Sequence, residues 1–74
     1  MARVTESELS DLTVQVNSKL AHMKRPYRVS VQARNGYYGV DPVAPADKYK
    51  SMGDALFIGS RAECKIFMHG MLRV

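Results

Sequence analysis

Four basic or titratable side chains near the end of the sequence recur at every fourth residue, a spacing that places them in one row on a helix surface. A row of cations of this kind can follow the phosphates of a nucleic acid, and the affinity would then fall as the salt concentration rises. A solvated helix face without a ligand is the alternative interpretation, and the sequence leaves both open. The four candidate residues are Arg61, Lys65, His69 and Arg73.

A second set of candidate binding residues lies on one face of a predicted β-hairpin. The set contains Arg28, Arg34 and Tyr37, and the predicted register makes Arg34 the cross-strand neighbour of Tyr37. An exposed tyrosine beside an arginine can stack on a base. Packing of the arginine on the tyrosine ring, which would only stabilise the hairpin, explains the same pair. A third candidate is the segment 48–50, in which one tyrosine lies between two lysines.

Residue types that usually carry out catalysis are few, and none falls in a catalytic motif. His22 and His69 each lie near the C-terminal end of a predicted helix, where a positive charge is favourable in itself. Cys64 falls in the apolar stripe of the second predicted helix, so we expect a small core residue rather than a nucleophile. The sequence contains no P-loop, dinucleotide-binding glycine motif or calcium loop. We therefore expect a protein without enzymatic activity, cofactor or metal ion.

Length and composition describe the chain that must position these residues. Its 74 residues, 46% hydrophobic and 24% charged, predict one globular domain over residues 1–74. The longest apolar run, residues 55–58, is far shorter than the ~20 residues that span a membrane, and the first residues lack the apolar core of a secretory signal. With Cys64 as the single cysteine, no intrachain disulfide can form. We expect a cytoplasmic protein without membrane contact.

The net charge of +4 is unevenly distributed along the chain. Residues 1–23 hold two basic and three acidic side chains, whereas residues 24–74 hold nine basic and four acidic ones. The basic part can attract nucleic acid or an acidic partner. A chain this short also buries only about 60% of the surface that its unfolded form exposes. A protein partner or a second copy, giving a homodimer, would supply further burial.

The first predicted element is a helix over residues 6–23. Thr5 and Glu8 have the spacing of a capping box, in which each side chain bonds the backbone N–H of the other residue. Pro26 disfavours helical geometry at the preceding residue and ends the element. The apolar residues of one helix face recur at three- and four-residue intervals, as Leu9, Leu12, Val16, Leu20 and Met23.

Alternating apolar and polar residues then predict a hairpin. Asn35-Gly36 is typical of a type I′ turn, in which both residues take positive φ. This loop sets Arg34 opposite Tyr37 and Val29 opposite Pro42. Pro42 then falls at a site that is not hydrogen-bonded to the first strand, so its missing N–H limits pairing only on the far side. The core-directed face is expected to carry Val29, Val31, Ala33, Tyr38, Val40 and Pro42.

The remainder of the chain predicts a loop, a short strand and a second helix. Residues 42–53 contain proline and glycine and are expected to be irregular, although the sequence does not define the conformation of residues 43–54. Residues 55–58 are predicted as a strand, and Ser60 with Glu63 forms a second capping box before a helix over residues 61–72. Gly70 would permit close approach to the first helix or let the last turn fray. The methionines Met52, Met68 and Met71 are expected to fill gaps in the core.

These elements predict an α+β fold in which two helices pack on one face of a small, three-stranded antiparallel sheet. Their order resembles that of double-stranded-RNA-binding domains, whose second helix opens with a Lys-Lys-x-Ala-Lys run. Here residues 61–65 read Arg-Ala-Glu-Cys-Lys, which keeps two of the three basic positions. The family has a Gly-Pro-x-His contact segment in its first hairpin loop, where this chain has only Asn35-Gly36. The resemblance implies RNA binding through the second helix.

The chain as a whole is similar to small accessory proteins encoded by tailed phages. Those proteins have a capped first helix, tyrosine-rich short strands and a Gly-Ser/Thr-Arg/Lys-x-Glu segment that opens a C-terminal helix. The corresponding segment here is residues 59–63, and the helix ends near Gly70. The group has no generally established activity, so the resemblance implies an accessory role. We expect a small, non-catalytic interaction or accessory protein, with nucleic-acid binding as the alternative.

Overall fold

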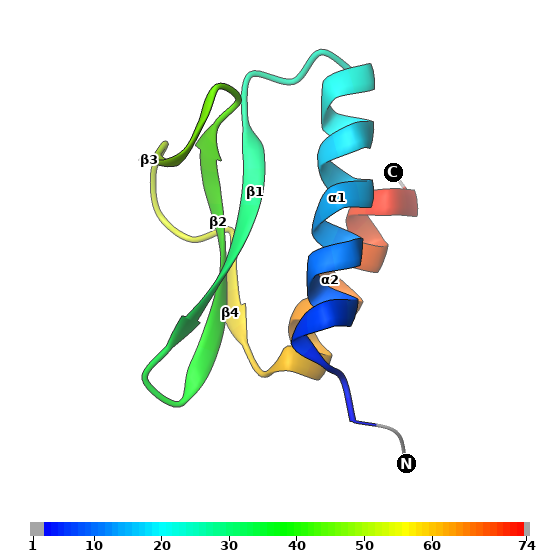
Figure 1. Cartoon of the computed structure of the whole chain (residues 1–74), viewed down its shortest axis with the longest axis vertical. Coiled ribbons are helices and arrows are strands. Elements are labelled where there is room, and N and C mark those ends of the chain that lie inside the picture. Colours follow the sequence, from blue (N-terminus) through cyan, green and yellow to red (C-terminus); the bar gives the residue numbers. More distant parts are fainter. Residues whose placement is uncertain (1–2, 74) are drawn as a thin grey trace.

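Two helices cover one face of a small antiparallel sheet, and this arrangement confirms the predicted α+β class (Figure 1). The computed structural model describes residues 3–73. Helix α1 packs on the edge strand β1, and α2 packs on β2 and β4. The elements in chain order are α1 (Glu6–His22), β1 (Arg28–Arg34), β2 (Tyr37–Ala44), β3 (Asp47–Ser51), β4 (Phe57–Gly59) and α2 (Arg61–Arg73).

The core lies between the helix layer and the sheet. Helix α1 contributes the predicted stripe from Leu9 to Leu20, whereas Met23, also predicted on this face, follows the helix and is 38% exposed. Helix α2 contributes Cys64 and Met68, which are completely buried. Phe57 of β4 and Phe67 of α2 stack with their ring centroids 4.9 Å apart. The buried cluster consists of Leu9, Leu12, Val16, Leu20, Val29, Val40, Cys64 and Met68.

The hairpin register agrees with the prediction, whereas the type of its turn does not. Arg34 pairs with Tyr37, and Val29 pairs with Pro42, as expected for a two-residue loop. Gly36 takes a positive φ of 84°, whereas the φ of Asn35 is not positive. Among residues 3–73, the one non-glycine residue with positive φ is Lys24. Positive φ at the second central residue alone is typical of a type II turn rather than type I′.

Residues 42–53 are largely ordered into strands, so the predicted irregular loop is wrong. Strand β2 continues to Ala44 and β3 returns beside it, so the sheet formed by residues 3–73 has four strands instead of the predicted three. On the far side of β2 from β1, the carbonyl of Pro42 accepts a hydrogen bond from the N–H of Met52 at 2.9 Å. β3 pairs with the part of β2 that follows Pro42 in the chain, and β4 pairs with the part that precedes Pro42. The missing N–H of Pro42 therefore lies at the position along β2 where pairing with β4 ends and pairing with β3 begins.

Three further predictions for this half of the chain need correction. The last strand occupies Phe57–Gly59 rather than residues 55–58. Met52, the residue after β3, is 49% exposed and does not fill a gap in the core. Gly70 is exposed, and a Cβ added to it would meet no atom within 4 Å, so it does not bring the two helices together.

Helix α1 ends in a Schellman motif that the sequence did not indicate. The N–H of Arg25 bonds the carbonyl of Leu20, and the N–H of Lys24 bonds that of Ala21. Lys24 takes φ 57° at the position where glycine is usual. The helix therefore stops at His22 through this motif, and Pro26 follows in the loop that leads to β1.

Helix α2 begins with the predicted capping box and ends against α1. The N–H of Glu63 bonds Ser60 Oγ, and Glu63 Oε1 accepts from the N–H of Ser60 at 2.8 Å. At the other end, Lys19 Nζ of α1 donates to the carbonyls of Met71 and Leu72. Figure 1 shows that α2 ends well short of the end of α1. One end of the helix layer therefore covers less of the sheet than the other.

Candidate interaction surfaces

The predicted basic row of α2 is divided between two different environments. Arg61 and Lys65 are half-buried and contact α1 or β2, whereas His69 and Arg73 are exposed. His69 and Arg73 border a shallow depression on the outer side of α2 together with Ile66, which is 71% exposed. The four side chains are therefore not one continuous track of available cations.

Arg61 belongs to a cluster of contacts around Tyr38. Its guanidinium lies over the Tyr38 ring, with Cζ 5.5 Å from the ring centroid, and Nη1 donates to the carbonyl of Val4. The hydroxyl of Tyr38 donates to Glu6 Oε1 at 3.1 Å. Arg61 thus connects the start of α2 to β2 and to the segment that precedes α1.

Lys65 forms an ion pair with the first turn of α1. Its Nζ lies 3.0 Å from Glu8 Oε2, and both side chains are partly exposed. This hydrogen bond from Lys65 is the main reason that the pKa of Glu8 lies below its ordinary value. The pKa of Glu63 is lowered as well, chiefly by the backbone N–H of Ser60. We call the contact region formed by Glu6, Glu8, Tyr38, Arg61 and Lys65 the closed end.

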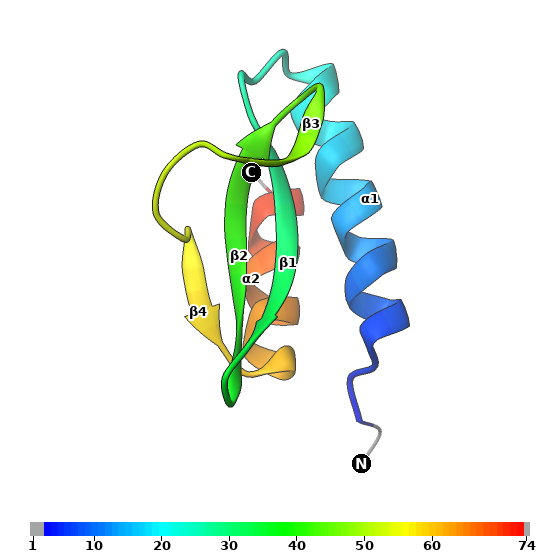
Figure 2. The same ribbon diagram turned by 60° about the vertical axis from the view of Figure 1, so that its left-hand side comes forward.

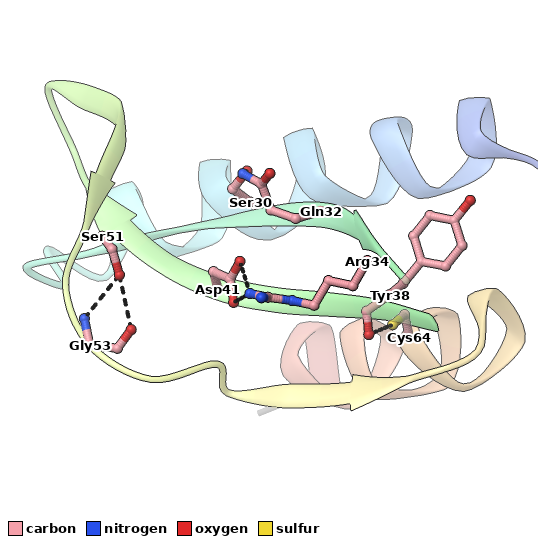
Figure 3. Close-up of polar contacts among 8 residues, drawn as sticks. All are labelled: Ser30, Gln32, Arg34, Tyr38, Asp41, Ser51, Gly53 and Cys64. Carbon is pink, nitrogen blue, oxygen red and sulfur yellow. Dashed lines mark hydrogen bonds and ion pairs between the residues drawn. The ribbon is translucent and has the colours of Figure 1, made fainter. Parts of the chain in front are cut away.

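The predicted pair of Arg34 and Tyr37 does not make the expected side-chain contact. Arg34 extends along β2 over Gly39, and its Nη2 lies 2.8 Å from both carboxylate oxygens of Asp41 (Figure 3). A Cβ on residue 39 would lie 2.6 Å from Arg34 Nε, so glycine is needed for this close approach. Tyr37, 41% exposed, has no cation over its ring among residues 3–73. Arg34 is therefore committed to an ion pair within the hairpin.

Arg28 also serves the hairpin rather than an open surface. Its Nη1 donates to the carbonyls of Arg25 and Tyr27 at 3.0 and 2.7 Å. These bonds fix the loop between α1 and β1. The hairpin thus carries Arg28, Arg34 and Tyr37 on one side of the sheet, as predicted. Of these three residues, only Tyr37 is both substantially exposed and without a polar partner within the described residues.

The candidate catalytic residues lie apart from one another. Cys64 is completely buried, as expected for a core residue, and burial followed by the charge of Glu63 raises the pKa of its thiol. Its Sγ points to the carbonyl of Tyr38 (Figure 3) and also contacts the carbonyl of Gly59. His22 and His69 are exposed near the ends of different helices. No group of three potential metal-ligating residues comes together between positions 3 and 73.

The sequence did not indicate an exposed apolar surface that lies beyond the end of α2. Two adjoining grooves of about 260 and 310 Å³ share Pro26 and Tyr27 in their linings. Met23, Met52 and Leu56 remain 38%, 49% and 41% exposed there. We call this surface the open end and define it by Met23, Tyr27, Met52, Leu56 and Met71.

Basic side chains line one of the two grooves of the open end, and an acidic side chain lines the other. Lys19 and Arg25 line the groove that contains Met23 and Met71, and Asp54 lines the second groove. Lys24, next to Met23, is exposed to solvent. The open end therefore combines flexible apolar side chains with a mainly basic border. Its residues come from three separate segments, so no local spacing in the sequence reveals them.

No helix among the described residues has the length and apolar character needed to cross a membrane. Comparison of the chain with protein-family models, curated protein sequences and solved structures gives no match in any of the three. The resemblances to phage accessory proteins and to double-stranded-RNA-binding domains therefore stay predictions, and the proposals for function rest on the surfaces described above.

Proposed function

We propose that the protein is a non-catalytic interaction module that binds an acidic, amphipathic helix of a partner protein at the open end. The observation that carries this proposal is the exposure of Met23, Met52 and Leu56 around two adjoining apolar grooves. Contiguous exposed apolar surface is typical of interaction sites. An accessory role through binding is also what the resemblance to small phage proteins implies.

The shape and composition of the open end favour a helix as the ligand. Helix α2 ends beside Lys19, so a further helix can lie beyond it on the same side of the sheet. Methionine side chains adapt to the ridges of a docking helix because they are unbranched and flexible. Helical ligands of this kind present apolar residues at three- and four-residue intervals.

The basic border favours an acidic partner over a basic one. Lys19 and Arg25 line the first groove, and the exposed Lys24 follows Met23 in the chain. Lys24 holds a left-handed backbone conformation that glycine would adopt more easily. The lysine at this position places a positive charge beside Met23, where it attracts carboxylates on the polar flank of a docked helix.

A synthetic helix with leucines on one face and glutamates elsewhere tests this proposal by calorimetric titration. We expect binding that weakens between about 50 and about 300 mM salt. A helix in which lysine replaces every glutamate should bind at least about tenfold more weakly. Met52→Asp should abolish binding, whereas Ile66→Asp, which makes the same change on the outer side of α2, should preserve it. Equal affinity for both helices, or no binding of either, would refute the proposal.

Nucleic-acid binding is the second candidate function, and one observation favours it at a different place from the basic row. Tyr49 in β3 is 83% exposed between two exposed lysines, with Lys48 Nζ 5.3 Å from its ring centroid. An exposed aromatic ring with adjacent cations suits a stacked base. This candidate is the segment 48–50 that the sequence also indicated.

Mobility shifts with single- and double-stranded RNA and DNA at two salt concentrations test this second candidate. Binding through β3 should disappear with Tyr49→Ala and persist with Tyr37→Ala, the matched change on the hairpin face. Binding through the basic row should instead be lost when Arg61→Ala and Lys65→Ala are combined. The absence of any shift at low salt would exclude both nucleic-acid sites.

A further inference from the structure

Strand β1 forms one edge of the sheet within residues 3–73, because it pairs with β2 alone. In a hairpin with a two-residue loop, the pair next to the loop is hydrogen-bonded and the pattern then alternates. Three residues of β1 therefore direct their backbone N–H and C=O groups away from β2. They are Val29, Val31 and Ala33.

The three outward-directed residues differ in how their backbone groups are satisfied. The side-chain amide of Asn17 in α1 accepts from the N–H of Val29 at 2.7 Å and donates to its carbonyl at 3.0 Å. The amide thus takes the place of a neighbouring strand at Val29. No hydrogen bond between described residues engages the outward-directed groups of Val31 or Ala33. The unpaired part of the edge is consequently limited to residues 30–34.

A groove of about 460 Å³ lies beside this unpaired part, between β1 and the N-terminal half of α1. Figure 2 shows α1 running alongside the outer edge of β1. Ser10 and Thr13 line the helix side of the groove, and their short side chains leave space between the helix and the strand. We call this space the edge groove.

We propose that the edge groove binds an extended segment of a partner protein, which adds a strand antiparallel to β1. The N–H and C=O groups of Val31 and Ala33 have the spacing of a strand partner, so an extended backbone satisfies all four of them. A second copy of this chain fits less well. Symmetric pairing of two β1 strands would bring both α1 helices over the same edge. This site is distinct from the open end and does not depend on it.

Charges at the two ends of the edge groove indicate the chemistry and direction of the segment. Glu6 lies toward Ala33, because it accepts a hydrogen bond from Tyr38, the cross-strand partner of Ala33. Lys48 also lines the groove and lies toward its Ser30 end, because the preceding residue, Asp47, pairs with Ala44 at the end of β2 that is far from Tyr38. An antiparallel segment therefore fits best with a basic residue at its N-terminal side and an acidic residue at its C-terminal side.

The two faces of the bound segment meet different surroundings. Residues opposite Val31 and Ala33 point to the helix side, where Leu9 and Thr13 line the groove. Small apolar side chains such as valine suit these positions. Residues between them point to the outer face, where Gln32 and Ser30 form a hydrogen bond with each other (Figure 3). Polar side chains such as threonine suit that face.

The probe that tests this site is a fluorescent peptide Lys-Thr-Val-Thr-Val-Glu with an acetylated N-terminus and an amidated C-terminus. Its valine N–H groups face β1 in the proposed register, and its threonine N–H groups face away. N-methylation of both valine nitrogens should weaken binding by roughly tenfold or more. N-methylation of both threonine nitrogens is the matched control and should leave the affinity unchanged. A peptide with lysine and glutamate exchanged should bind more weakly than the original.

Two further tests change the protein instead of the peptide. Ala33→Pro removes the outward N–H without removing a hydrogen bond to β2, and it should abolish peptide binding. Ser10→Arg fills the groove from an exposed helix position, and Ser18→Arg adds the same charge to α1 outside the groove. We expect Ser10→Arg to abolish peptide binding and Ser18→Arg to leave it unchanged. This pair of variants tests the proposal even if the Ala33→Pro protein does not fold.

Three results would overturn the proposal. The first is failure of the unmodified peptide to bind, and the second is equal affinity for the two N-methylated forms. The third is a dimer in sedimentation experiments that Ser10→Arg, but not Ser18→Arg, converts to monomer, because the groove would then serve a second copy. Binding of the peptide to Met52→Asp at unchanged affinity would support the edge groove and separate it from the open end.

Discussion

At the closed end of the molecule, charged side chains from α1 and α2 contact each other and the sheet, whereas at the open end they surround exposed apolar side chains. Lys65 pairs with Glu8, and Arg61 lies over Tyr38 at the closed end. At the open end, Lys19 caps the carbonyls of α2 and Arg25 borders a groove that is mostly apolar. The difference teaches that a basic residue in the sequence can serve either the fold or a binding surface, and its neighbours in space decide which.

The largest expected effect concerns two methionines in these contrasting environments. Met68 is completely buried, and Met52 at the open end is 49% exposed. Met68→Ala should destabilise the protein by about 2–5 kcal/mol because it leaves a cavity. Met52→Ala should change the free energy of unfolding by less than about 0.5 kcal/mol. Urea denaturation measures both, and a similar loss for the two variants would show that Met52 supports the fold.

The next largest effect concerns Asn17, which lies along α1 between the two ends. Asn17→Ala leaves both backbone groups of Val29 without their partner and should cost about 2 kcal/mol in the free energy of unfolding. Ser18→Ala is the control at the neighbouring, exposed position of the same helix. Equal stability of the two variants in urea denaturation would contradict the role of Asn17 as a substitute for a neighbouring strand.

A smaller effect, with the opposite sign, is expected at Lys24. Lys24→Gly relieves the left-handed conformation at the end of α1 and should stabilise the protein by about 1 kcal/mol. Lys24→Ala removes the same charge while keeping the backbone strain, so it should bring no such gain. Both variants should weaken binding of the acidic helix at low salt. A Lys24→Gly protein no more stable than Lys24→Ala in thermal unfolding would contradict the left-handed conformation of this residue.

The smallest effect is a dependence of stability on pH that belongs to the closed end and the start of α2. The pKa values of Glu8 and Glu63 lie below their ordinary value of 4.5 in the folded protein. Their ionised forms therefore stabilise the fold above about pH 4.5, and this contribution is lost as the pH falls through the lowered folded values. The melting temperature should fall between about pH 6 and about pH 3, and less steeply in the variant with Glu8→Gln and Glu63→Gln. Identical slopes for both proteins would contradict this assignment.

The elements with local signals could be predicted from the sequence. The spacing of Leu9, Leu12 and Val16 defined α1, and the two-residue loop defined the hairpin register. The capping box of Ser60 and Glu63 located the start of α2. β3 could not be predicted, because its residues are all exposed and lack the alternation that marks a half-buried strand.

The candidate sites were harder to predict than the fold. The prediction placed Arg34 correctly on the hairpin face, yet the side chain pairs with Asp41 rather than with Tyr37. Because Gly39 has no side chain, the guanidinium of Arg34 can lie along β2 and reach Asp41. The open end joins residues such as Met23 and Leu56 that are far apart in the sequence. Asn17 has no local sequence signal, because a helix residue that substitutes for a strand is recognisable only from the packing of α1 on β1.

Methionine-methyl NMR during titration with the acidic amphipathic helix is the most direct test of the central claim that the open end is the binding surface. The methyl groups of Met23, Met52 and Met71 belong to side chains that line the open end, whereas Met68 lies in the core and serves as an internal reference. We predict that the signals of Met23, Met52 and Met71 shift together while that of Met68 stays in place. A titration that saturates without moving those three signals would contradict the account.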